Sequence, residues 1–72
     1  MPNLPVLKPK ELARALERAG FYLVRQRGSH AQYKRGNLLV TLSMHTGDLN
    51  SATLRSILRQ AKMSVEELLE LL

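Results

Sequence analysis

The chain has 72 residues, with eleven lysines and arginines against six acidic residues, a formal net charge of +5 and no cysteine. This length makes one small domain, and the absence of cysteine excludes a disulfide framework and a thiolate zinc site. No apolar run approaches the roughly 20 residues that span a bilayer, so no membrane segment is predicted. Residues 1–7 hold two prolines and no periodicity, and we expect a flexible lead-in there before a single domain over residues 8–72. The start of the chain lacks the pattern of a secretory signal, so the expected compartment is the cytoplasm.

The charge is unevenly distributed along the chain. Residues 20–47 hold several basic residues and no acidic one, whereas residues 64–72 hold three glutamates and no base. A basic surface attracts polyanions, because Lys and Arg at phosphates release condensed counterions. The pattern favours nucleic acid as a partner, with a solvated basic surface as the alternative.

The first predicted helix begins near Pro9, since proline fits the first turn of a helix, and ends at Gly20. Its apolar residues recur at i, i+3, i+4 and i+7, as in one buried stripe: Leu12, Ala15, Leu16 and Ala19.

Three short strands are predicted next, over Phe21–Arg27, His30–Arg35 and Leu38–Ser43. Gly28-Ser29 and Gly36-Asn37 are two-residue turn signals between them, with Gly28 taking a positive φ. The segment therefore predicts a three-stranded antiparallel meander.

The two turns together predict the register of the sheet. The first places Arg27 opposite His30, Arg25 opposite Gln32 and Leu23 opposite Lys34. The second places Tyr33 opposite Val40, Ala31 opposite Leu42 and His30 opposite Ser43. Because partners share a face and alternate residues switch faces, one face is expected to be apolar: Tyr22, Val24, Ala31, Tyr33, Leu38, Val40 and Leu42. The other is expected to be polar and exposed: Arg25, Arg27, His30, Gln32, Lys34, Thr41 and Ser43. Three apolar residues are left on this polar face: Phe21, Leu23 and Leu39.

Two further helices follow a connection over residues 44–50. The first repeats the apolar stripe with Leu54, Ile57, Leu58 and Ala61, and Asn50 or Ser51 is available as its cap. The second, Val65–Leu71, opens with a capping box formed by Ser64 and Glu67. The predicted fold is α+β: α-β-β-β-α with a short C-terminal helix, and helices covering one face of a three-stranded antiparallel sheet. Double-stranded RNA-binding domains have the same order of elements.

Three landmarks in order resemble the HicA family of bacterial toxins over roughly residues 8–72. They are the triplet GSH (residues 28–30), the turn at His45, and the helix TLRSILRQA followed by a serine-capped tail. Lys62 departs from the family, in which glycine is common after this helix. The resemblance implies a double-stranded RNA-binding-domain-like fold, a toxin of a type II toxin–antitoxin system that cleaves mRNA, a HicB antitoxin partner, a bacterial or archaeal cell, and His30 as the catalytic histidine.

The residues around His30 are also suited to RNA cleavage without this resemblance. An imidazole can give or take a proton near neutral pH, and RNA supplies its own 2′-hydroxyl as nucleophile. Four basic side chains are candidates for holding phosphate oxygens: Arg25, Arg27, Lys34 and Arg35. Gly28 permits a tight turn, Ser29 is available to orient the imidazole or donate to phosphate, and His45 is a candidate second acid or base. This route needs no metal or cofactor, and none is predicted.

Two other interpretations remain open at this stage. A non-catalytic double-stranded RNA-binding module is compatible with the fold order and the basic stripe, since such domains bind by shape and phosphate contacts. A pure interaction protein is compatible with the composition, its charge serving only solubility. His30 would then be an ordinary exposed strand residue.

Overall fold

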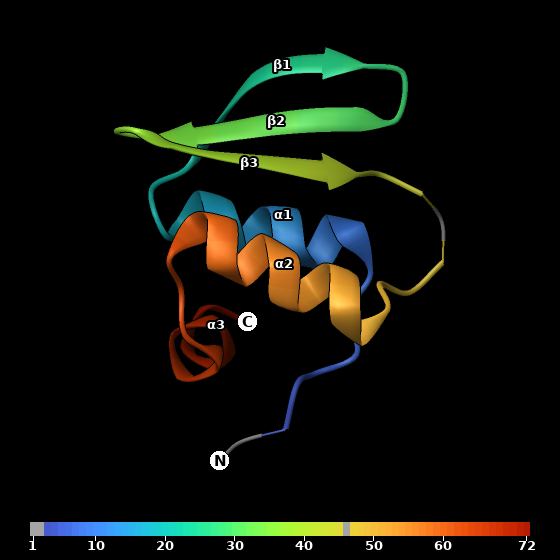
Figure 1. Ribbon diagram of the computed structural model, residues 1–72, viewed down its shortest axis with the longest axis vertical. Coiled ribbons are helices and arrows are strands. Elements are labelled where there is room, and N and C mark those ends of the chain that lie inside the picture. Colours follow the sequence, from blue (N-terminus) through green and yellow to red (C-terminus); the bar gives the residue numbers. More distant parts are fainter. Residues whose placement is uncertain (1–2, 46) are drawn as a thin grey trace.

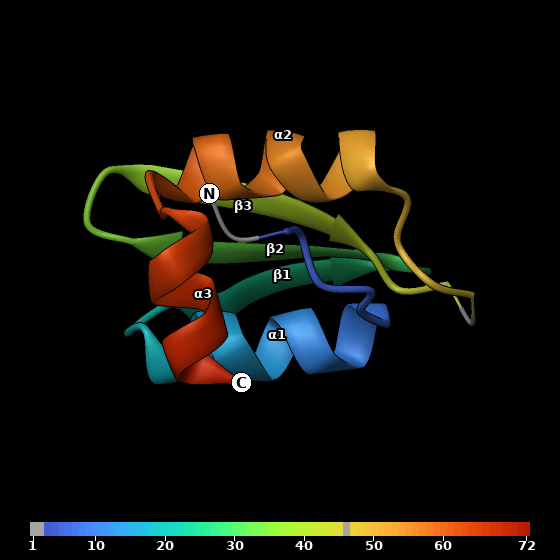
Figure 2. The ribbon, with the colours of Figure 1, turned by 90° about the horizontal axis from the view of Figure 1, so that it is seen from below.

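A computed structural model describes residues 3–45 and 47–72, and it has the predicted order of elements. The elements are α1 (Pro9–Arg18), β1 (Tyr22–Arg27), β2 (His30–Arg35), β3 (Leu38–Ser43), α2 (Ser51–Ala61) and α3 (Val65–Leu71). The strands form one antiparallel sheet in the order β1-β2-β3. The helices lie on one face of the sheet (Figure 1, Figure 2). The predicted α+β class is confirmed.

Helices α1 and α3 begin at the residues that the sequence predicts. Helix α1 starts at Pro9, and the Glu11 carboxylate accepts a hydrogen bond from the Lys8 backbone N–H at 3.0 Å. At the start of α3 the Ser64 hydroxyl accepts from the Glu67 N–H, and the Glu67 carboxylate accepts from the Ser64 N–H, both at 3.1 Å. This is the predicted capping box.

Helix α2 is capped at both ends. The Asn50 side chain accepts from the Thr53 N–H at 2.8 Å, so Asn50 is the N-cap. At the other end Lys62 takes a left-handed conformation with φ +53° and ψ +45°. Glycine favours that conformation because it has no Cβ. The helix stop therefore keeps its geometry without the glycine.

The register of the second hairpin is confirmed at every predicted pair, from His30 opposite Ser43 to Tyr33 opposite Val40. In the first hairpin the pairs of Arg27 and Arg25 are confirmed, but the pairing of Leu23 with Lys34 is wrong. A β-bulge lies between Leu23 and Arg25, so that Leu23 stands opposite Tyr33.

The bulge corrects the predicted faces at the start of β1. Tyr22 and Val24, expected in the core, are exposed, and Phe21, expected on the polar face, is only 3 % exposed. Leu23 and Leu39 remain exposed. The extra residue at the bulge shifts the alternation by one, which allows Phe21 to be buried against the helices.

The core fills the space between the sheet and the helices. The sheet contributes Ala31, Tyr33, Val40 and Leu42, each buried. The largest fully buried side chains come from the three helices and β3: Leu12, Leu16, Val40, Leu42, Leu54 and Leu68. Since this face carries the apolar contacts, the opposite face is free for polar residues.

The two edges of the sheet differ. Beside β3, the Gln60 side chain of α2 accepts a hydrogen bond from the Thr41 N–H at 3.3 Å. All six residues of β1 are exposed, and this strand forms the other edge. A bulge and charged side chains disfavour the addition of a further strand at such an edge, and β1 has both.

The end of the predicted lead-in packs on the domain. Leu7 is 4 % exposed, and its carbonyl accepts a hydrogen bond from the Leu49 N–H at 2.8 Å. This contact holds the start of α1 beside the segment that follows β3.

Candidate active site

The uncovered face of the sheet carries half of the site residues that the sequence predicts: Arg25, Arg27, His30 and Lys34. Cross-strand partners share a face, and the observed pairs align three rows of side chains across the three strands. The rows are Arg27–His30–Ser43, Arg25–Gln32–Thr41 and Tyr22–Lys34–Leu39. We call these nine positions the open face.

The turn before His30 fixes its backbone position. Gly28 has φ +55°, a conformation that glycine adopts without strain, and its carbonyl accepts a hydrogen bond from Gln26 Nε2 at 3.2 Å. The Ser29 carbonyl accepts from the Met44 N–H at 2.6 Å, which ties the turn to the segment after β3. His30 is the first residue of β2, and its side chain is exposed.

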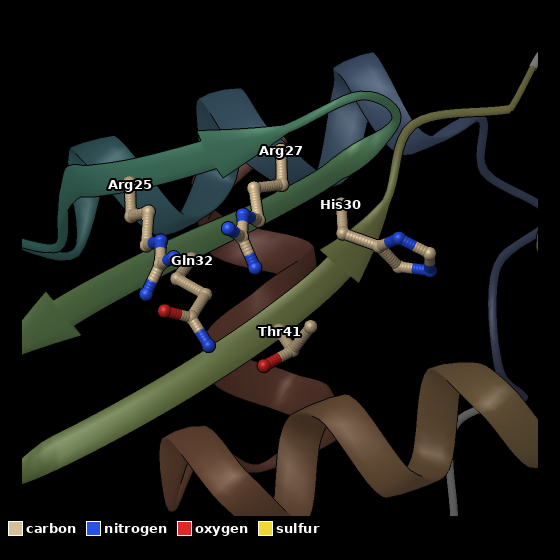
Figure 3. A pocket seen from close by; sticks show the side chains of 5 residues that line it. All are labelled: Arg25, Arg27, His30, Gln32 and Thr41. Atoms are coloured by element: carbon tan, nitrogen blue, oxygen red, sulfur yellow. The ribbon is translucent and has the colours of Figure 1, made fainter.

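A shallow hollow of about 250 Å³ lies on the open face, lined by Arg25, Arg27, His30, Gln32 and Thr41. In Figure 3 both arginines reach over the sheet toward Gln32, and the imidazole of His30 points past the end of β3. The hollow is smaller than the ~300–1000 Å³ of typical small-molecule pockets. It is therefore suited to part of a larger ligand that lies across the surface.

The chemistry of this hollow is cationic. Two guanidinium groups, an imidazole, an amide and a hydroxyl supply hydrogen-bond donors, and no carboxylate occurs between Gly20 and Gly47. Guanidinium groups bind phosphate oxygens in a bidentate manner. The arrangement can hold a phosphodiester with an imidazole within its reach.

The structure separates the other two predicted phosphate ligands. Lys34 lies on the open face, one row beyond Arg25 and Gln32. Arg35 instead pairs with Leu38 and shares the helix-facing side with Tyr33. Its guanidinium lies 4.9 Å from the ring centroid of Phe21, and Nη1 donates to the Ala19 carbonyl at 2.7 Å. Arg35 is thus engaged at the end of α1, away from the hollow.

His45 lines a second hollow of about 290 Å³, with Lys8, Pro9, Lys10 and Met44. The two histidines are therefore not lining residues of the same hollow. The hydrogen bond between Met44 and Ser29 nevertheless brings the segment of His45 beside the turn of His30.

Sequence reasoning did not assign Gln32 and Thr41 to the site. Their predicted position on the polar face, in the row beside His30, was the available signal. Lys8 and Lys10 were also missed, because only the fold brings the start of α1 next to His45. For the Ser29 hydroxyl no hydrogen bond occurs within residues 3–45 and 47–72, and its orienting role stays a prediction.

Tyr33 is oriented away from the open face. It is 6 % exposed, and burial, with a smaller contribution from the charge of Glu17, raises the pKa of its phenol above the ordinary value near 10. The phenol therefore stays protonated at neutral pH, and the ring is unavailable for stacking on a base.

Two further properties concern the described part of the chain. Its helices do not reach the length and hydropathy of a membrane-spanning helix. In the same residues no three side chains of His, Cys, Asp or Glu come together as metal ligands.

The comparison with protein families agrees with these features. The family model described as "HicA toxin of bacterial toxin-antitoxin" matches residues 9–63. This range includes α1, the whole sheet, both histidines and α2. The search of curated proteins finds no relative that matches. Because the match extends over most of the chain, the protein belongs to the HicA toxin family of bacterial toxin–antitoxin systems.

Proposed function

We propose that this toxin is a metal-independent endoribonuclease that cleaves mRNA, with His30 as general acid or base. The observation that carries the proposal is the row Arg27–His30–Ser43 beside the cationic hollow. Directly opposite residues of an antiparallel pair have Cα atoms about 5.5 Å apart or less, and both side chains are exposed. One phosphodiester would contact both the Arg27 guanidinium and the His30 imidazole after the imidazole rotates back toward Arg27.

The reaction would use the 2′-hydroxyl of the RNA itself. Its oxygen forms a bond to phosphorus while the bond from phosphorus to the 5′-oxygen breaks. One proton leaves the 2′-hydroxyl and one reaches the departing 5′-oxygen, which gives a 2′,3′-cyclic phosphate and a 5′-hydroxyl. His30 transfers one of these protons, and Arg25 and Arg27 stabilise the charge that develops on the phosphorane oxygens.

The second proton needs another group or water. We propose His45 as the candidate, because the hydrogen bond between Met44 and Ser29 keeps its segment next to the turn of His30. Two such groups would give a bell-shaped dependence of kcat/KM on pH.

Membership of the family implies an antitoxin partner. We propose that this partner covers the open face, because a bound protein must deny RNA access to His30. Tyr22 and Leu39, 55 % and 48 % exposed in the row farthest from His30, provide apolar contact area there.

A cleavage assay on a long single-stranded RNA, run in excess chelator, tests the proposal. The wild type should cut, and His30→Ala should lose about 10²–10⁴-fold in rate while circular dichroism shows an unchanged fold. His45→Ala, measured in the same assay, tests the second role. Cyclic phosphate ends on the products would support attack by the 2′-hydroxyl.

The same assay separates the other interpretation. If neither the wild type nor His30→Ala cuts while both bind duplex RNA with steep salt dependence, the protein is a binding module. Cutting that requires an added divalent cation would instead reject the metal-independent route.

A further inference from the structure

The second hollow joins two segments that are distant in sequence. Its lining combines Lys8, Pro9 and Lys10, at the start of α1, with Met44 and His45, after β3. The hydrogen bond from the Leu49 N–H to the Leu7 carbonyl, 2.8 Å long, holds these two segments together. Both lysines are exposed, so two ammonium-bearing side chains and an imidazole line the same surface hollow.

This hollow adjoins the open face. Ser43 stands opposite His30 at a Cα distance of about 5.5 Å or less. His45 follows two residues later, at most about 7 Å further along the chain. In Figure 1 the turn between β1 and β2, the end of β3 and the start of α1 lie at one end of the molecule. Figure 3 shows the His30 imidazole pointing past the end of β3, away from Arg25 and Arg27.

Among the residues that line this hollow, the formal charges are those of Lys8 and Lys10, both positive. The acids nearest in sequence are Glu11 and Asp48, and neither lines it. The Glu11 carboxylate lies beside the hollow, since it accepts the Lys8 backbone N–H at 3.0 Å, and it offsets part of the positive charge of the lysines. The lysines still extend the cationic surface that begins at Arg25 and Arg27.

We propose that this second hollow is a phosphate subsite, at which Lys8 and Lys10 bind the RNA strand where it continues beyond the phosphate at His30. The inference rests on the proposed RNA substrate. An RNA strand carries one phosphate per nucleotide, so a strand that crosses the open face brings further phosphates toward this end of the sheet. Two adjacent cationic hollows fit such a ligand better than they fit an isolated anion.

The experiment compares Lys8→Ala/Lys10→Ala with Arg14→Ala/Lys62→Ala. Both double variants remove two exposed charges, but the control pair lines other hollows. Binding is measured by fluorescence anisotropy with a 2′-O-methyl oligoribonucleotide of about 12 nucleotides, within the usual site size for a single strand. The methyl groups block the nucleophile, so binding is measured without cleavage.

The expected result is a smaller salt dependence for the Lys8/Lys10 variant. Each lost phosphate contact lowers the slope of log K against log salt by about 0.7. The slope should therefore fall by about 1.4, which corresponds to about 25-fold weaker binding at about 0.1 M salt relative to 1 M. The ratio of kcat/KM for an unmodified oligomer of the same length to that for a dinucleotide should fall to a similar extent. The control pair should keep this ratio.

The outcomes distinguish this inference from the proposed function. A fall in slope supports the subsite even if the wild type does not cleave RNA, because binding is read out separately. If the wild type cleaves RNA and both double variants keep its salt slope and its ratio of kcat/KM values, the subsite is overturned and the nuclease proposal stands. Loss of antitoxin binding alone in the Lys8/Lys10 variant assigns the surface to the antitoxin and also overturns it.

Discussion

Arg27 and Arg35 lie on either side of His30 in the sequence, but their surroundings differ. Replacement of Arg35 should lower the stability of the fold, whereas replacement of Arg27 should weaken RNA binding. Arg35→Ala removes a guanidinium–ring contact with Phe21 at 4.9 Å, worth about 0.5–1 kcal/mol at an exposed site. It also removes a 2.7 Å hydrogen bond to the Ala19 carbonyl at the end of α1, worth about 0.5–1.5 kcal/mol. The sum is about 1–2.5 kcal/mol, and each 1 kcal/mol lowers Tm by about 4–8 °C in a domain of this size.

Arg27→Ala should leave stability within about 0.5 kcal/mol of the wild type, because the side chain is exposed. Its effect should instead be on RNA, with the salt slope of binding reduced by about 0.7. Arg35→Ala should keep the wild-type slope.

Thermal unfolding, monitored by circular dichroism, measures Tm. Anisotropy of a 2′-O-methyl oligonucleotide at several salt concentrations measures the salt slope of binding. If Arg35→Ala reduces the salt slope as much as Arg27→Ala does and leaves Tm unchanged, the separation of the two arginines by the two faces of the sheet is wrong.

Three predictions concern stability. Lys62→Gly should be about 1 kcal/mol more stable than Lys62→Ala, because only glycine relieves the φ of +53°; equal urea midpoints for the two variants would contradict this. Leu42→Ala should cost about 2–5 kcal/mol in urea unfolding, since Leu42 is fully buried, and Leu39→Ala is the exposed control. The raised pKa of Tyr33 means that the folded state favours the protonated phenol. The resulting contribution to the free energy of unfolding is fully present below pH ~10 and is lost as the pH rises through the higher pKa of the folded state. Tyr33→Phe should therefore lose less stability at alkaline pH than the wild type does. An equal loss of stability in the two proteins would reject this.

The sequence predicted most of the fold because local signals and global packing agree. Gly36 carries a positive φ at the second turn, and alternation beyond it fixes every pair of β2 and β3. Asn50 and Ser64 cap the helices as their residue types suggest.

The bulge in β1 could not be predicted in the same way. Tyr22 and Val24 fit the alternating pattern of a regular strand, and no glycine marks the irregularity. The bulge allows Phe21 to be buried, and this burial can be foreseen only if the position of the end of α1 relative to the sheet is known. Tertiary packing outweighed local alternation here.

The candidate site was partly predictable. Side-chain alternation alone places Arg35 on the same face of the sheet as Tyr33, opposite to the face of Lys34. The face on which Arg35 lies could therefore have been predicted from the register. The proximity of Lys8 and Lys10 to His45 was not available, because it arises from the hydrogen bond between Leu7 and Leu49, which are 42 residues apart.

The core and the open face lie on opposite sides of one sheet, and this arrangement affects how the toxin can lose its activity. Replacement of His30 removes an exposed side chain, so the inactive protein is expected to fold and to keep the rest of its surface. If the antitoxin binds that surface, such a copy acts as a decoy that sequesters antitoxin from any active toxin in the same cell. A loss-of-function allele would then increase toxicity when both copies are expressed, whereas a core substitution such as Leu42→Ala would not.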